Sequence, residues 1–267
     1  MKSVKEHDPV PSLSRVAVVY PKAIGDLVFI LPALHNLRLS FPEASLMLIV
    51  KAKQAPLALP LAGGIVDEVL VLHGGTGLLE ARRRLTAFHA DVIADMAGND
   101  ISGLLIAFRA GRRIRPHRTA CKGFGAMYSV FAESFPPPAQ GTHRVDEMRG
   151  MAGFLGAQTG TVTFEMNLPA QAADDSSDIV GRFSLRDGKV VVLNIGASRE
   201  TKRWPAGHFR KLAELLVESG YRVVIAGAGA FRSDGNYDRA ASQRFFADDF
   251  VDGRRCVNLV REGYSEP

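Results

Sequence analysis

Long apolar runs are missing from the sequence. None of its apolar stretches reaches the roughly 20 residues that a transmembrane helix requires, and the first ten residues, MKSVKEHDPV, lack the uninterrupted apolar core of a signal peptide. We therefore expect a cytoplasmic protein. The sequence is 46% hydrophobic, a composition that excludes a disordered tail or a fibre. Its 267 residues are enough for one large domain or two smaller ones.

The sequence also has few cysteines and a small net charge. Cys121 and Cys256 lie far apart and outside any Cys-x-x-Cys or Cys/His spacing, so the sequence gives no sign of a disulfide framework or a zinc site. We expect both to be buried apolar residues. The formal net charge of +5 is small for a nucleic-acid-binding protein, so we expect no nucleic-acid partner. An anionic membrane surface or a phosphorylated substrate would suit such an excess.

Short β-branched runs alternate with apolar-periodic segments in the first half of the chain. Strands are expected at Arg15–Tyr20, Ser45–Val50, Glu68–Leu72 and Asp91–Asp95, each followed by a helix. This alternation predicts an α/β fold in which helices cover a parallel sheet. Ligands of such sheets bind at the carboxyl ends of the strands.

The alternation breaks in the middle of the chain. Phe135-Pro-Pro-Pro138 cannot continue a helix, and a further helix is expected at about His143–Leu155. The polar stretch Asn167–Ser177 then has the composition of a linker. We place the domain boundary at Pro169, which gives domains of residues 1–168 and 169–267.

The second half restarts the same pattern. Strands are expected at Lys189–Asn194, Arg222–Ala226 and Arg254–Val260, with helices at Pro205–Glu218 and near Tyr237–Phe246. Three strands are about half of what a nucleotide-binding domain of this type normally contains. We therefore expect the second domain to be incomplete.

Asp26 follows the first expected strand, in the turn Lys22-Ala-Ile-Gly25. Asp is a favoured N-cap residue and leucines at helical spacing follow it, so capping alone explains the residue. Its position also places a carboxylate where open α/β sheets bind ligands. There it could accept a proton, and the positive end of the helix dipole would favour its charged form.

The loop after the strand Lys189–Asn194 suits a phosphate. Small residues (Gly196, Ala197), hydroxyls (Ser198, Thr201) and Lys202 precede Pro205, which stands at a typical first helical position. Such a loop offers N–H donors, hydroxyls and a point charge to a diphosphate, although a solvated basic loop has the same composition. Gly227-Ala-Gly229 follows the next strand. Arg232 replaces the third glycine of a dinucleotide-binding turn, so we interpret Gly227 as part of a turn that lets a ligand approach the backbone.

Several segments in both domains together resemble the glycosyltransferase family 9 heptosyltransferases. They are Lys22-Ala-Ile-Gly-Asp26 with Leu31-Pro-Ala-Leu34 and Leu37–Glu43, then Asp95–Gly98 and Arg109–Ile114, and finally Asn194–Ser198 with Lys202–Pro205 and His208-Phe209. The resemblance implies two Rossmann-like domains in the GT-B arrangement, the first for the acceptor and the second for the nucleotide sugar. It implies transfer of a heptose from ADP-heptose to the lipopolysaccharide inner core, with no cofactor besides the donor.

The resemblance also implies roles for individual residues. Asp26 is the implied general base, Lys202 neutralises the departing diphosphate, and Ser198, Thr201 and Gly227 complete the donor site. The sequence contains no Asp-x-Asp, which favours Lys202 and helix N–H groups over a metal bridge and implies an inverting, metal-independent single displacement.

An acidic glycolipid of the Kdo-lipid A type is the implied acceptor, met at the cytoplasmic face of the inner membrane. Lys22 and the basic run that contains Arg112, Arg113 and Arg115 are the candidate acceptor contacts, and a solvated charged strand end explains the run equally well.

One departure from the family pattern affects the expected activity. The sequence ends at Glu262–Pro267 before the donor-binding segment that continues the second domain in the family, so we expect a C-terminally truncated member. Two alternatives to an active transferase follow. One is an impaired remnant that only binds the acidic glycan acceptor, and the other is a dinucleotide-dependent oxidoreductase based on Gly227-Ala-Gly229.

Overall fold

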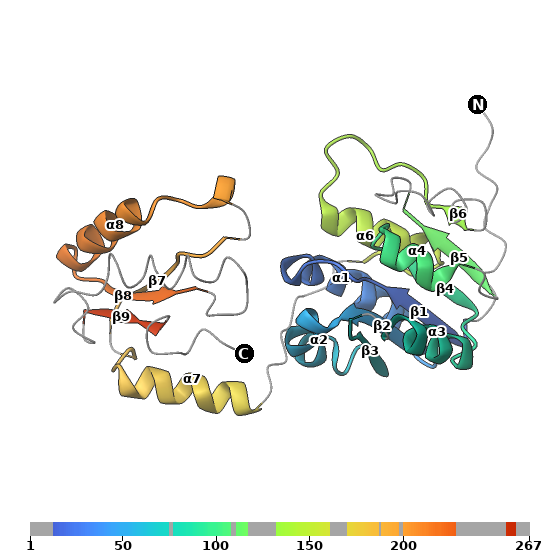
Figure 1. The fold of residues 1–267 in the computed structure, drawn as a ribbon, viewed down its shortest axis with the longest axis horizontal. Coiled ribbons are helices and arrows are strands. Elements are labelled where there is room, and N and C mark those ends of the chain that lie inside the picture. Colours follow the sequence, from blue (N-terminus) through green and yellow to red (C-terminus); the bar gives the residue numbers. More distant parts are fainter. Residues whose placement is uncertain are drawn as a thin grey trace. The chain divides into compact units, whose positions relative to one another are not determined.

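A computed structural model describes residues 13–74, 77–107, 111–116, 132–160, 170–186, 188–197, 200–227 and 255–259. Contacts divide the chain into two compact units, Met1–Leu168 and Pro169–Pro267, and Figure 1 shows the elements of each. Every helix within the described ranges is too short or too polar to span a bilayer.

The first unit contains a six-stranded parallel sheet in the order β3-β2-β1-β4-β5-β6. The strands are β1 (Arg15–Val19), β2 (Ser45–Lys51), β3 (Glu68–Leu72), β4 (Val92–Asp95), β5 (Arg112–Arg115) and β6 (Glu133–Ser134). This is the strand order of a doubly wound nucleotide-binding fold, and its direction reverses between β1 and β4. The α/β fold with a parallel sheet is confirmed, and β5 and β6 are strands that the sequence analysis did not predict.

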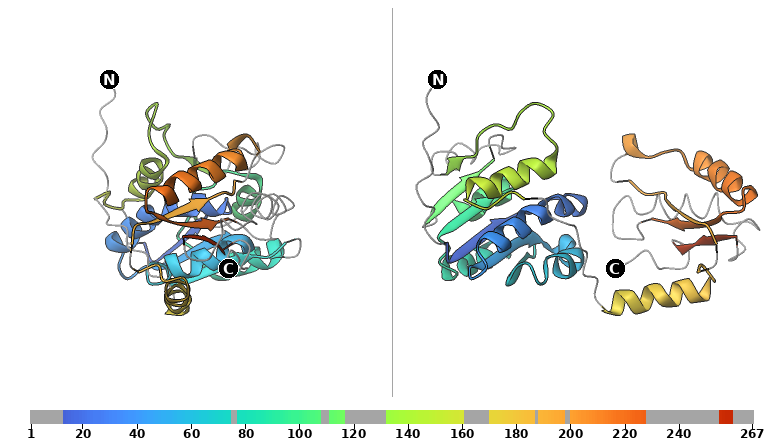
Figure 2. Two further views of the ribbon diagram at one scale, coloured as in Figure 1. Left: turned by 90° about the vertical axis from the view of Figure 1, so that its left-hand side faces the viewer. Right: turned by 180° about the vertical axis from the view of Figure 1, so that it is seen from behind.

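Helices cover both faces of this sheet because successive side chains of a strand point to opposite faces. On one face lie α1 (Ile24–Ser40), α2 (Ala55–Ala62) and α6 (Arg144–Phe154), and on the other lie α3 (Gly77–Ala87) and α4 (Asp100–Ile106). The right-hand view of Figure 2 shows α1 (blue) and α6 (yellow-green) from the side opposite to Figure 1. The helix expected at His143–Leu155 is therefore present as α6.

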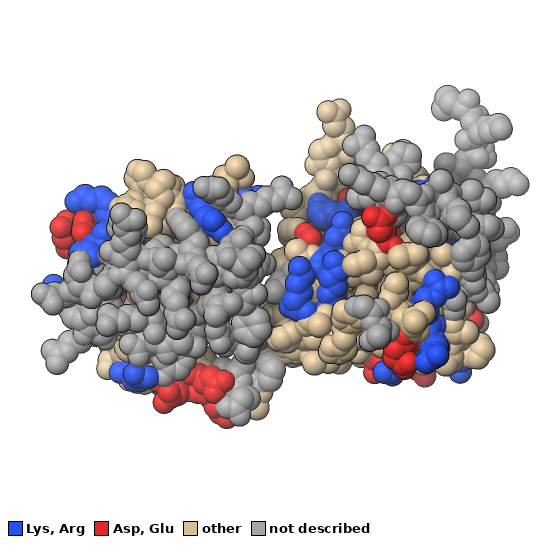
Figure 3. All heavy atoms as spheres, in the orientation of Figure 1, with Lys and Arg blue, Asp and Glu red and all other residues tan. Residues whose placement is uncertain are grey.

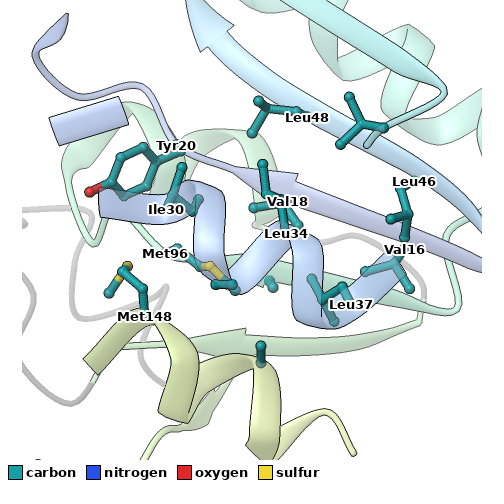
Figure 4. Packing of buried hydrophobic residues seen from close by; sticks show 14 of the residues in the cluster. Val16, Val18, Tyr20, Ile30, Leu34, Leu37, Leu46, Leu48, Met96 and Met148 are labelled. Atoms are coloured by element: carbon teal, nitrogen blue, oxygen red, sulfur yellow. The ribbon is translucent and has the colours of Figure 1, made fainter. Parts of the chain in front are cut away.

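The two cores separate along β1. Val16, Val18 and Tyr20 pack with α1 and α6, whereas Ala17 and Val19 pack with α3 and α4. Figure 4 shows the Tyr20 ring beside Ile30 of α1. Because β1 is buried on both faces, the position at which its carboxyl end emerges is fixed by packing.

The second unit contains a parallel sheet in the order β7-β8-β9. Its described elements are α7 (Ala170–Arg182), β7 (Val190–Asn194), the 3₁₀ helix η2 (Glu200–Lys202), α8 (Ala206–Glu218), β8 (Arg222–Ala226) and β9 (Cys256–Asn258). One face of the sheet packs against α8. Cys256 is buried as expected, whereas Cys121 and the helix expected near Tyr237–Phe246 lie outside the described residues.

The linker expected at Asn167–Ser177 is wrong for most of its length. Helix α7 begins at Ala170, directly after Pro169, where proline is well tolerated. Its Asp and Ser side chains are exposed, and Ile179 and Val180 near its end are half-buried. The polar composition therefore belongs to a solvated helix face. Ser184, at φ 50°, lies just beyond the helix end.

Candidate functional site

The reversal of strand order between β1 and β4 defines the candidate site of the first unit. The chain leaves β1 toward α1 on one face of the sheet and leaves β4 toward α4 on the other face. The two connections therefore diverge at the carboxyl ends of neighbouring strands. In open α/β sheets this divergence opens the crevice in which ligands bind.

Asp26 lies in the first turn of α1 at this crevice. Helix α1 begins at Ile24 with Ala23 as its N-cap, so the expectation that Asp26 is the N-cap residue is wrong. Asp26 instead occupies the third helical position, and its Oδ2 accepts a hydrogen bond from the Ala23 N–H at 3.2 Å. The helix starts earlier because a carboxylate three residues into it can reach back to the free N–H of the cap residue.

The second carboxylate oxygen of Asp26 is available. Among the residues that the structure describes, Oδ1 has no hydrogen-bond partner, and the side chain is partly exposed. The neighbouring Gly25 is exposed, and apart from its chain neighbours and its own helix backbone a Cβ there would meet no atom within 4 Å. Asp26 can therefore receive a proton from a ligand while it keeps its contact with Ala23.

Two side chains fix the connection between β1 and α1. Asn99, the N-cap of α4, donates from Nδ2 to the Pro21 carbonyl at 3.1 Å. The buried Gln54 donates from Nε2 to the Ala23 carbonyl at 3.4 Å. The connection that carries Asp26 is thus held from both neighbouring strands. The sequence analysis missed Asn99 and Gln54, although the N-cap position of Asn99 before a helix is a recognisable signal.

Asp95 at the end of β4 shapes the other side of the crevice. It is buried and accepts hydrogen bonds from the N–H groups of Ala97 and Gly98 at 2.8 Å each and from the Ser102 hydroxyl at 2.9 Å. Asn99 and Ser102 complete a reciprocal capping pair. Both carboxylate oxygens of Asp95 therefore stabilise the turn that places Asn99 against Pro21.

A half-buried charged group, Arg144, lies next to Tyr20 at the end of β1. Arg144 of α6 contacts Glu147 Oε2 at 2.5 Å and the Met96 carbonyl at 3.2 Å, and it interacts electrostatically with Tyr20. Burial raises the pKa of Tyr20 above its ordinary value. The charge of Arg144 lowers that pKa, and the charge of Asp26 raises it further. Burial would lower the pKa of Arg144, but Glu147 raises it above its ordinary value. Tyr20 is thus neutral and Arg144 charged at neutral pH.

The predicted acceptor contacts are not all brought together. Lys22 lies four residues before Asp26 on the same connection, half-buried. Arg115 is the last residue of β5 and lies toward the carboxyl end of the sheet. Arg112 instead pairs with Val92, three residues before the end of β4, which is about 10 Å from that edge.

The side chains of the β5 arginines differ in their partners. Arg112 forms an ion pair with Glu133 of β6 at 2.9 Å, which also raises the pKa of Arg112. Arg113 pairs in register with Ile93, one residue beyond Val92. Among these three arginines, Arg115 is the one that the fold places nearest to the crevice.

The candidate donor residues of the second unit lie at one edge of its sheet. Asn194 at the end of β7 pairs with Ala226 at the end of β8, so the loop that leads to Thr201 and Lys202 begins beside Gly227. Gly196 donates its N–H to Asn194 Oδ1 at 3.0 Å, which turns the chain. Thr201 and Lys202 are exposed in η2, and Ser198 lies outside the described residues.

Trp204 connects this loop to α8. Its ring stacks on His208 with centroids 5.4 Å apart and meets Phe209 edge-on at 4.9 Å. Phe209 packs against the core of the second unit. The Lys202-Arg-Trp-Pro205 segment is therefore anchored by its aromatic residue, which holds the end of η2 near the start of α8. Among the described side chains, no group of three or more His, Cys, Asp or Glu could hold a metal ion.

Comparisons with known proteins agree on one family. A family model described as glycosyltransferase family 9 (heptosyltransferase) matches residues 78–246. Lipopolysaccharide heptosyltransferase 2 of Escherichia coli K12 is 25% identical over 248 residues, which is 85% of this chain and 67% of that protein. The corresponding protein of Salmonella typhimurium is also 25% identical, over 242 residues that cover 85% of this chain and 67% of its own length.

Solved structures show the same architecture. The family 9 glycosyltransferase of Veillonella parvula matches with a TM-score of 0.71 at 18% identity, over 92% of this chain and 69% of that one. E. coli heptosyltransferase WaaC with ADP-2-deoxy-2-fluoro heptose matches with a TM-score of 0.66 at 20% identity, over 94% of this chain and 78% of that one. These likenesses confirm the expected GT-B type of fold. The region of the family model begins after Asp26 and includes Thr201 and Lys202.

Proposed function

Because this chain belongs to glycosyltransferase family 9, whose model matches more than half of its residues, we propose that it transfers a heptose from ADP-heptose to the inner core of lipopolysaccharide. Membership in this family makes the chain a glycosyltransferase. The choice of sugar and acceptor is the proposal. It is supported by relatives that are named lipopolysaccharide heptosyltransferase 2 and by the similar structure of E. coli heptosyltransferase WaaC with ADP-2-deoxy-2-fluoro heptose.

The proposed chemistry depends on Asp26. An acceptor hydroxyl attacks the anomeric carbon from the face opposite the diphosphate, and its proton passes to Asp26 Oδ1. The bond from the anomeric carbon to the phosphate oxygen breaks, its electron pair leaves with ADP, and the configuration inverts. The observation that carries this proposal is the carboxylate oxygen at the β1 to α1 connection, without a partner among the described residues and open beside Gly25.

The donor diphosphate is assigned to the second unit. Lys202 supplies the positive charge that balances the departing diphosphate, and Ser198 and Thr201 supply hydroxyl donors. Gly227 lies beside the start of the same loop, because Asn194 at the end of β7 pairs with Ala226 at the end of β8. We propose that this set acts without a metal bridge and that the chain needs no cofactor besides the sugar donor.

The acceptor is assigned to the first unit. We propose a glycolipid of the Kdo-lipid A type, bound near Lys22 and Arg115 at the carboxyl edge of the sheet. Arg112 and Arg113 belong to the same basic run but lie further from this edge. Such an acceptor would bring the enzyme to the cytoplasmic face of the inner membrane.

A transfer assay with purified chain tests the proposal. ADP release and product mass are measured with ADP-heptose and a Kdo-containing acceptor, first for the wild type and then for Asp26→Asn. The amide keeps an oxygen that can accept from the Ala23 N–H but cannot take the proton, so turnover should fall about 100-fold or more. Glu43→Gln removes an exposed carboxylate of the same unit and should leave turnover unchanged.

Two results would count against the proposal. If Asp26→Asn retains wild-type turnover, Asp26 acts only at the helix start. If the wild type binds the acceptor but forms no product, the chain is an acceptor-binding remnant. The family assignment removes the oxidoreductase alternative.

A further inference from the structure

Three lysines lie on the two connections that follow the neighbouring strands β1 and β2, the first of which also carries Asp26. Lys22 follows β1, Lys51 is the last residue of β2, and Lys53 lies in the 3₁₀ helix η1 (Ala52–Gln54). The parallel register pairs Val19, the last residue of β1, with Ile49, so the connection with Lys22 leaves the sheet beside the end of β2, where Lys51 lies. The cluster of Lys22, Lys51 and Lys53 is therefore built by neighbouring strand ends.

Gln54 holds the two connections together. Its Oε1 accepts the Lys51 N–H at 3.0 Å, and its Nε2 donates to the Ala23 carbonyl at 3.4 Å. Gln54 is buried, so these bonds are shielded from water. One side chain thus fixes the backbone of Lys51 relative to the turn that carries Asp26, and the cluster exists before any ligand binds.

The positive charge of the cluster is not balanced by an ion pair. Within the described parts of the chain, none of the three lysines has an acidic side chain within 4.0 Å, and Asp26 is the carboxylate on the same connection as Lys22. Burial lowers the pKa of Lys51, and the charges of Lys53 and Lys22 lower it further. Figure 3 shows blue side chains gathered over the end of the first unit at which α1 begins. An anion placed here would relieve the repulsion among the lysines.

We propose that Lys22, Lys51 and Lys53 bind an acidic group of the acceptor, a carboxylate or a phosphate, next to Asp26. Lysine ammonium groups act as compact point charges with several donors, which suits either anion. This inference rests on the proposed function and makes it more specific. It places the acidic group on the β2 side of β1, whereas the basic run of β5 lies on the β4 side.

Direct binding to the full chain tests the cluster without any turnover. Inorganic phosphate and free Kdo are titrated separately by calorimetry into the wild type, Lys51→Gln and Lys53→Gln. Each variant should bind the preferred probe about tenfold more weakly, equivalent to about 1.4 kcal/mol. Lys51→Arg should recover most of the affinity because it keeps the charge. Arg83→Gln, which removes an arginine that is 82% exposed on α3, controls for net charge and should bind like the wild type.

The two probes separate the two sources of the anion. A loss confined to Kdo identifies a carboxylate site, and a loss confined to phosphate identifies a phosphate site. Unchanged binding of both probes in Lys51→Gln and Lys53→Gln, or no binding of either probe to the wild type, overturns the inference. Weakened probe binding in a chain that forms no heptosylated product supports the cluster and refutes the transferase. If both variants form product with an unaltered KM for the acceptor, the result supports the transferase and refutes the lysine cluster.

Discussion

Replacing Arg144 by methionine should destabilise the first unit by about 2 kcal/mol. The change keeps most of the apolar stem but removes the guanidinium from Glu147 and from the Met96 carbonyl. A fully exposed ion pair contributes about 0 to 1 kcal/mol, and removing one partner of a fully buried pair costs about 3 to 5 kcal/mol. The side chains of Arg144 and Glu147 are 30% and 19% exposed. The expected cost therefore lies between these limits.

A second substitution separates the lost attraction from the stranded charge. Glu147→Met in the Arg144→Met background removes the carboxylate that the first change leaves unpaired. The double variant should therefore recover about 1 kcal/mol, since much of the cost of breaking such a pair comes from the remaining charge. Arg83→Met, at a position that is 82% exposed, should change the free energy of unfolding by less than about 0.5 kcal/mol.

Urea unfolding followed by two probes measures these differences. Far-ultraviolet circular dichroism reports both units, whereas fluorescence follows Trp204, the one tryptophan of the sequence, which lies in the second unit. The hydrophobic cores of the two units share no residues, so the fluorescence midpoint should stay constant. A loss below about 0.5 kcal/mol in Arg144→Met, or a double variant no more stable than the single one, would refute the reasoning.

Three further outcomes are expected. Lys202→Gln should lower kcat with ADP-heptose about 100-fold if Lys202 balances the departing diphosphate, whereas Lys211→Gln on α8 should leave it unchanged; equal rates for the two would remove Lys202 from the donor site. Asp95→Asn should cost about 2 to 3 kcal/mol in urea unfolding, because the amide cannot accept all the bonds that the buried carboxylate accepts. Burial raises the pKa of Asp67, but bonds from the Leu46 N–H and Arg38 outweigh it and the net pKa is lowered. The stability that Asp67 contributes is therefore present above its unfolded pKa of about 3.9 and lost as the pH falls through the folded value. Asp67→Asn should weaken this acid dependence in unfolding measured from pH 6 to pH 2.

The central strands could be predicted from the sequence because their burial leaves a local pattern. β1 and β2 are buried along nearly their whole length, so they appear as continuous apolar runs between polar turns. β5 carries arginine at three of its four positions, and Ile114 alone is buried. Such a segment lacks the continuous apolar run that identifies a buried strand, so the sequence alone leaves its pairing with β4 unpredicted.

The contacts that hold the site could not be predicted for a related reason. Gln54 reaches the Ala23 carbonyl across 31 residues of sequence, and Asn99 reaches the Pro21 carbonyl across 78. Local periodicity identifies the turn that carries Asp26 because that turn follows a recognisable strand. It holds no information about the side chains from other loops that fix the turn. Those partners follow from the strand order, which is a property of the whole sheet.

Capping and catalysis need not compete at Asp26, because each can use a different oxygen. Oδ2 accepts the Ala23 N–H, which satisfies a donor that the start of α1 leaves free. The same bond restricts the rotation of the carboxylate and leaves Oδ1 without a partner among the described residues. A negative charge is also favourable in the first turn of a helix. The structural role of the residue thereby orients the oxygen that the proposed reaction requires, and this is why an amide at position 26 separates the two roles.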